Sequence, residues 1–146
     1  MHGRGHARRV SGARALAVLA AGLLAWLGSR ACERPPAPPG SLDDAIARRL
    51  VDVWVEGEGR VRRLLEDDRE GVPHQRLLVD VGRGRTVLVV HNLDVAERVP
   101  AREGDEVRFR GEFQWNERGG LVHWTHRDPE GRREGGFVRH AGKDYR

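Results

Sequence analysis

The chain has 146 residues, enough for one domain, and its formal net charge is +4. That basic excess lies at the N-terminus, because residues 1–32 contain five arginines and no acidic residue. Residues 33–146 hold 21 basic and 22 acidic side chains, a net charge of −1. A surface that binds nucleic acid through its charge is therefore not expected in that part of the chain.

The first predicted element is an export signal over residues 1–32. Four arginines precede an apolar run over residues 15–28, and small residues follow it, which is the pattern of a secretory signal. This run is shorter than the about 20 residues that a membrane-spanning helix needs. We therefore expect an extracytoplasmic protein, periplasmic or secreted, for which a membrane tether through the N-terminus stays open.

Cys32 follows the apolar run and is the only cysteine, which excludes an intrachain disulfide and cysteine-based zinc sites. Its place resembles that of a lipid-bearing cysteine, so lipidation is one expectation. Against it, Ser29 and Arg30 stand where such signals have a large aliphatic residue and a small residue. Ser29 and Ala31 suit ordinary signal cleavage instead, and the two alternatives remain open.

Residues 33–40 are rich in proline and predict an extended linker, after which residues 41–146 form a single domain. Ser41 is typical of a helix N-cap, and acidic residues occupy the turn that follows it, where the helix dipole favours them. Leu42, Ile46 and Leu50 recur at helical spacing, so a short amphipathic helix is predicted over residues 42–52.

The apolar period then changes from 3.6 to 2, which predicts strands separated by turns. The clearest strand is 107–115, where apolar and polar residues alternate except at Gly111. Residues 82–84 predict a hairpin turn and residues 67–73 a solvated loop. The expected strands cover residues 54–65, 75–81, 85–91, 107–115, 121–126 and, as a short last strand, 137–140.

The fold class that follows is mainly β. Five strands in an antiparallel meander, with a glycine-bearing first strand and one short N-terminal helix packed at one end, favour a small OB-like barrel. A rolled sheet of another topology is the alternative.

Polar residues with catalytic chemistry gather in the second half of the chain. On regular strands His123 and His126 point to opposite faces, and no His-x-His or His-Glu-x-x-His motif is present, so neither a metal site nor a cofactor is predicted. One interpretation has His91 and Asp94 meeting one of these histidines in a cleft. In the other, Asn92 and Asp94 make side-chain turn bonds and His91 is a rim residue with its hydrogen bonds satisfied. The catalytic candidates are His91, Asp94, Glu112, His123 and His126.

Aromatic residues on OB strands can stack on bases or sugar rings, although in a small domain they more often supply core area. The ligand-binding candidates are Trp115, Asn116, Trp124, His126 and Asn92.

Several blocks of the sequence resemble an uncharacterised bacterial family, domain of unknown function 3465. The resemblance runs from about Trp54 to Tyr145 and implies an exported bacterial domain without implying an activity. Its most specific parts are His91-Asn92-Leu93-Asp94 and His123-Trp124-Thr125-His126.

Three functions are compatible with these patterns. A non-catalytic envelope module that binds a small or oligomeric ligand ranks first. A hydrolase or nuclease that uses histidine and carboxylate side chains, with or without a metal, is the second, and a structural envelope protein is the third.

Overall fold

The computed structural model describes residues 40–68, 70–133 and 135–146. The predicted export signal, Cys32 and most of the proline-rich linker lie outside the described residues. Within the described part, no helix has the length and apolar character needed to cross a membrane.

Helix α2 (Leu42–Ala47) begins where the sequence predicts it and ends earlier than predicted. The Ser41 side chain caps its first turn by accepting a hydrogen bond from the backbone N–H of Asp44, at 3.2 Å. Leu42 and Ala45 are buried against the sheet. The helix cannot continue to residue 52 because Arg49 adopts a left-handed backbone with φ of 56°, which turns the chain into the first strand.

Seven strands follow, and the alternating apolar pattern predicts most of their extents. They are β1 (Val51–Asp68), β2 (His74–Gly82), β3 (Arg85–Asn92), β4 (Glu106–Gln114), β5 (Leu121–His123), β6 (Phe137–His140) and β7 (Lys143–Tyr145). Strand β1 is longer than expected, β5 is shorter, and β7 was not predicted.

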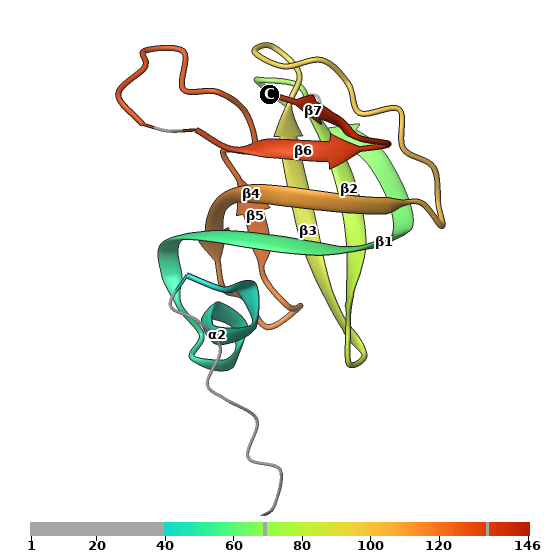
Figure 1. Cartoon of the computed structure of the whole chain (residues 1–146), viewed down its shortest axis with the longest axis vertical. Helices are drawn as coiled ribbons and strands as arrows, with labels where there is room; N and C mark the ends of the chain where they lie inside the picture. Colours follow the sequence, from blue (N-terminus) through green and yellow to red (C-terminus); the bar gives the residue numbers. More distant parts are fainter. Residues whose placement is uncertain (1–39, 69, 134) are drawn as a thin grey trace, which may run out of the picture. The chain divides into compact units, whose positions relative to one another are not determined.

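The domain is mainly β, as predicted, and five strands form a closed ring in the order β1-β2-β3-β5-β4 (Figure 1). The 18-residue strand β1 closes it by pairing with β4 over Val51–Arg60 and with β2 over Arg60–Asp68. The arrangement differs from a simple meander because β5 lies between β3 and β4 and runs parallel to β3. Strands β6 and β7 form a hairpin attached to β4.

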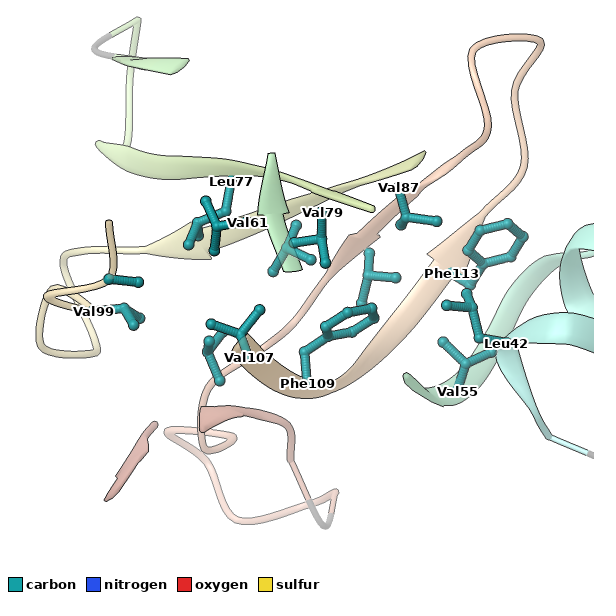
Figure 2. Packing of buried hydrophobic residues seen from close by; sticks show 14 of the residues in the cluster. Leu42, Val55, Val61, Leu77, Val79, Val87, Val99, Val107, Phe109 and Phe113 are labelled. Atoms are coloured by element: carbon teal, nitrogen blue, oxygen red, sulfur yellow. The ribbon is translucent and has the colours of Figure 1, made fainter. Parts of the chain in front are cut away.

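Apolar side chains from all around the ring fill its interior (Figure 2). Phe109 and Phe113 of β4 are its largest fully buried side chains. Glycine is required where β1 crosses over this core: a Cβ at Gly59 would lie 2.1 Å from the carbonyl oxygen of Asp80.

The outer edge of β4 is shared between two partner strands. Residues 112–114 pair with β5, whereas residues 107–110 pair with β6. Between these pairings the chain leaves the sheet as a loop over residues 124–136. The loop passes very close to β4, because a Cβ at Gly136 would lie 2.3 Å from the carbonyl oxygen of Arg110.

Candidate functional site

A cleft of about 550 Å³ lies where the start of β2, the ends of β3 and β5, and the loop after β5 meet. Its volume falls in the range of small-ligand sites, about 300–1,000 Å³. Among the residues that line it are His74, Val90, Asn92, His123, Trp124 and His126.

The β2–β3 hairpin supplies one wall of this cleft. His74 and Asn92 are paired across the hairpin. Val90, two residues before Asn92 on β3, points to the same outward face of the strand. The Asn92 side-chain oxygen accepts a hydrogen bond from the backbone N–H of Asp94, at 2.9 Å. This bond starts the turn that ends β3 and holds the Asn92 amide at the rim.

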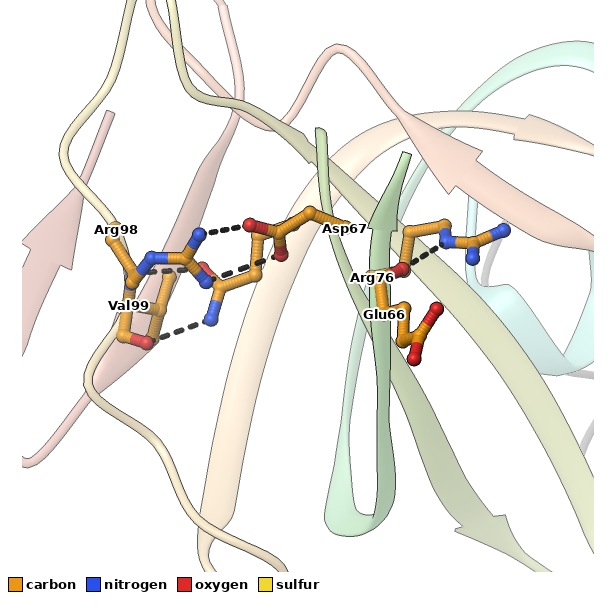
Figure 3. A network of polar contacts seen from close by, with 6 residues as sticks. Glu66, Asp67, Arg76, Arg98 and Val99 are labelled. Carbon is orange, nitrogen blue, oxygen red and sulfur yellow. Dashed lines mark hydrogen bonds and ion pairs between the residues drawn. The ribbon is translucent and has the colours of Figure 1, made fainter. Parts of the chain in front are cut away.

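The loop after β3 is held in place by buried polar bonds although it contains no helix or strand. The amide of Gln75 donates to the carbonyl of Val99 at 2.8 Å and accepts from the N–H of Val99 at 2.9 Å. Beside it, Arg98 forms an ion pair with Asp67 of β1 (Figure 3). These contacts fix the segment that carries Val95, another residue of the cleft wall.

Trp124 stands at the rim in an unusual backbone conformation. Its φ is 55°, which is rare for a bulky side chain, and its side chain remains 37% exposed. The next residue, Thr125, is held in place: it is fully buried and donates a hydrogen bond from its hydroxyl to the carbonyl of Val90 at 3.1 Å. Conformations of this kind cost about 1–3 kcal/mol and persist only where the surroundings impose them.

The left-handed turn at Trp124 also changes where the two histidines of this segment lie. Strand β5 ends at His123, so the alternation expected up to residue 126 does not apply. His123 and His126 both line the cleft, rather than facing opposite sides of a sheet. The His126 ring lies 5.4 Å from the Trp124 ring, centre to centre.

A carboxylate, an imidazole and a guanidinium meet behind Trp124. His123 Nε2 lies 3.2 Å from Glu112 Oε1, without the alignment of a hydrogen bond. The other oxygen of Glu112 is 3.7 Å from the Arg133 guanidinium, and that guanidinium lies 5.5 Å from the centre of the Trp124 ring. Glu112 thereby links β4 to both sides of the loop.

His91 lies beneath the cleft and is fully buried. Its Nδ1 is 2.9 Å from the Thr125 hydroxyl oxygen, and its Nε2 is 3.1 Å from the Glu97 carbonyl oxygen. Because the Thr125 hydroxyl proton is donated to the Val90 carbonyl, the Thr125 oxygen and the Glu97 carbonyl oxygen both present lone pairs to the His91 ring. A neutral ring carries a single N–H and can donate to only one of these two oxygens. Burial lowers the pKa of His91, so the neutral form is favoured despite this.

Asp128 organises the loop that forms the far wall. Its carboxylate accepts hydrogen bonds from the backbone N–H groups of Glu130 at 3.1 Å, and of Arg132 and Arg133 at 2.9 Å each. These bonds, with that from Glu130 the largest contribution, lower the pKa of Asp128. The aspartate is thus satisfied by the chain's own backbone.

A family model described as protein of unknown function, DUF3465, matches residues 34–146. The chain belongs to this DUF3465 family. No curated protein matches the chain. Every residue of the cleft lies within the DUF3465 match, so the site is part of the family domain.

The DUF3465 domain brings together only part of the predicted candidate set. Asn92, His123, Trp124 and His126 line the cleft, and Glu112 contacts it through His123. His91 is buried below it, sealed by its own hydrogen bonds.

The remaining candidates lie elsewhere. Asp94 is exposed and faces a second depression, near Lys143. Trp115 donates from its backbone N–H to the carbonyl of Leu50 beside α2, and Asn116 accepts from two N–H groups of its own turn. Trp115 and Asn116 therefore belong to the opposite end of the ring.

Several residues of the site were not among the predicted candidates, including His74, Asp128 and Arg133. Asp128 and Arg133 act through a loop whose path depends on the turn at Trp124, and the sequence pattern around them carries no sign of it. Throughout the described ranges 40–68, 70–133 and 135–146, no three His, Cys, Asp or Glu side chains come together as a set that could hold a metal ion.

Proposed function

We propose that this DUF3465 domain is a non-catalytic, extracytoplasmic module that binds a ligand in the cleft beside Trp124. The location rests on the arginine-rich and apolar N-terminal sequence, which is typical of an export signal. The ligand-binding role rests on the cleft, and one observation carries it.

That observation is the exposed Trp124, held in a left-handed conformation at the rim of a concave site. A tryptophan that only supplied core area would point inward and would need no strained backbone. Strain of this kind concentrates at ligand sites, because it places a side chain where an unstrained chain would not. The buried Thr125 next to it anchors the backbone that carries the indole, which lowers the entropy lost on binding.

The position of the cleft in the ring supports the same role. OB-folds bind oligonucleotides and oligosaccharides on the outer face of their second and third strands. In this domain β2 and β3 form the corresponding hairpin, and the cleft lies at the open end of that hairpin, at His74 and Asn92.

A hydrolase is the second candidate, and the approach of His123 to Glu112 favours it. A carboxylate beside an imidazole can orient it for general acid–base work. Against this, Ser41, the only serine of residues 33–146, caps α2 at the far end of the domain and cannot serve as a nucleophile beside His123.

The test is a binding screen on the purified full chain with sugars, peptides, nucleotides and lipid headgroups, followed by calorimetry. We expect a ligand whose affinity falls about tenfold in Trp124→Ala, since aromatic stacking contributes about 1–3 kcal/mol. Trp115→Ala is the matched control: its ring also lies under an arginine, Arg49, at 4.9 Å, but it is remote from the cleft. Failure of the whole screen, or equal losses in both variants, would contradict the proposal.

The hydrolase alternative is separated by His123→Asn. If the domain only binds, no member of the screen is consumed by the wild-type protein, and His123→Asn changes affinity alone. Turnover by the wild type that His123→Asn abolishes would replace the binding module with an enzyme.

A further inference from the structure

We infer that the ligand of the cleft is an uncharged saccharide that stacks on Trp124, an inference that rests on the proposed function. It follows from how the charges, the aromatic ring and the unpaired polar groups of the cleft are arranged.

The charged side chains in and against the cleft largely compensate one another. Arg132 pairs with Glu130, Arg133 approaches Glu112 at 3.7 Å, and Asp128 is held by backbone N–H groups. Apart from the histidines, two positive and three negative side chains leave a net charge of −1. Such a site lacks the excess of positive charge that a phosphate or carboxylate ligand would require.

A cationic ligand is disfavoured by the surroundings of Trp124. The Arg133 guanidinium already lies 5.5 Å from the centre of the indole ring. A ligand cation placed on the same ring would be repelled by Arg133, although the ring itself attracts positive charge. The remaining open surface of the indole therefore suits an apolar, uncharged face.

The polar groups around the ring match a ligand rich in hydroxyl groups. Three polar groups of the cleft form no hydrogen bond with any described residue: the His74 ring, the amide nitrogen of Asn92 and Nε2 of His126. An amide nitrogen can donate to a hydroxyl oxygen, and an imidazole nitrogen that carries no proton can accept from a hydroxyl group. Together with Val90 in the wall, they offer what a sugar ring has: an apolar face and a polar edge.

The experiment is calorimetry on the full chain with cellotetraose, chitotetraose and maltotetraose as neutral probes. Tetragalacturonate and an oligothymidylate serve as anionic probes. We expect at least one neutral probe to bind with an affinity that is unchanged between 50 and about 500 mM NaCl, because no ion pair is screened. Trp124→Ala should weaken it about tenfold, Trp124→Phe should retain most of it, and Trp115→Ala should leave it unchanged.

Thermal unfolding of each variant confirms that a loss of affinity is not a loss of folding. If only an anionic probe binds, and its affinity depends on both Trp124 and salt, the inference of an uncharged ligand is overturned. The proposed ligand-binding function would then still hold. The inference of an uncharged saccharide is likewise overturned if the neutral probes fail and a charged or non-saccharide member of the broader screen binds at Trp124. If no member of that screen binds, the proposed function fails as well.

Discussion

At the scale of single residues, Trp124 combines an unfavourable backbone with an exposed side chain. The two effects can be separated, because glycine and alanine both remove the indole and differ only in the Cβ. A left-handed residue with a Cβ costs about 1–2 kcal/mol, part of which glycine gives back through the entropy of its unfolded chain.

We therefore predict that Trp124→Gly is more stable than Trp124→Ala by about 0.5–1 kcal/mol, while both variants lose ligand binding. Urea denaturation of the two proteins at the same pH measures the difference. Equal stabilities would mean that the backbone at residue 124 relaxes once the indole is gone, and that the ring itself imposes the turn.

His91 provides a second prediction, on pH dependence. Its pKa is lowered by burial, so the unfolded chain takes up a proton near the ordinary value of about 6.5, whereas the folded protein does so only at lower pH. Its contribution to stability is therefore complete above about pH 6.5 and is lost as the pH falls from there through the folded-state pKa.

In His91→Gln this dependence should be absent. The variant should lose about 1–3 kcal/mol at pH 8, because a buried hydrogen bond is disturbed, and should show a flatter stability profile between pH 7.5 and about 5. Denaturation at several pH values in that window provides the measurement. An unchanged slope in His91→Gln would show that other groups cause the acid sensitivity.

At the scale of elements, the loop after β3 depends on one buried amide more than on its surface ion pair. Gln75 satisfies both backbone groups of Val99, and replacing it with leucine leaves them buried without partners. We predict that Gln75→Leu costs about 2–4 kcal/mol, whereas Arg98→Ala, which removes an exposed ion pair, costs less than about 1 kcal/mol. Thermal unfolding compares them, and a larger loss in Arg98→Ala would reverse this assignment.

The strands and the hairpin turn could be predicted from the sequence because their apolar alternation reports directly which face is buried. The strand order was not predictable in this way. The pairing of β5 with β3 depends on which residues of β4 pair with β5 and which pair with β6. The apolar periodicity of β5 does not reveal which strands lie next to it.

The candidate site was predictable as a set of residue types and less so as an arrangement. The block around Trp124 was identified, but its left-handed turn, which brings His123 and His126 to one cleft, has no signature in residue type: left-handed positions favour glycine or asparagine. Likewise, Arg49 ends α2 in a conformation that its helical spacing does not reveal.

At the scale of the whole molecule, the domain has two distinct ends. Helix α2 lies at one end, beside the β2–β3 turn (Figure 1). The cleft lies at the other end, beside the loop after β3. The proposed binding site is therefore separate from the helix with which the described part of the chain begins.

The most direct test of this account follows the indole N–H signals of the full chain during titration with the neutral oligosaccharides. The account predicts that the Trp124 signal shifts in a saturable way, while those of Trp54 and Trp115 stay in place. Saturable shifts centred on Trp115, with Trp124 unaffected, would contradict the assignment of the cleft as the binding site.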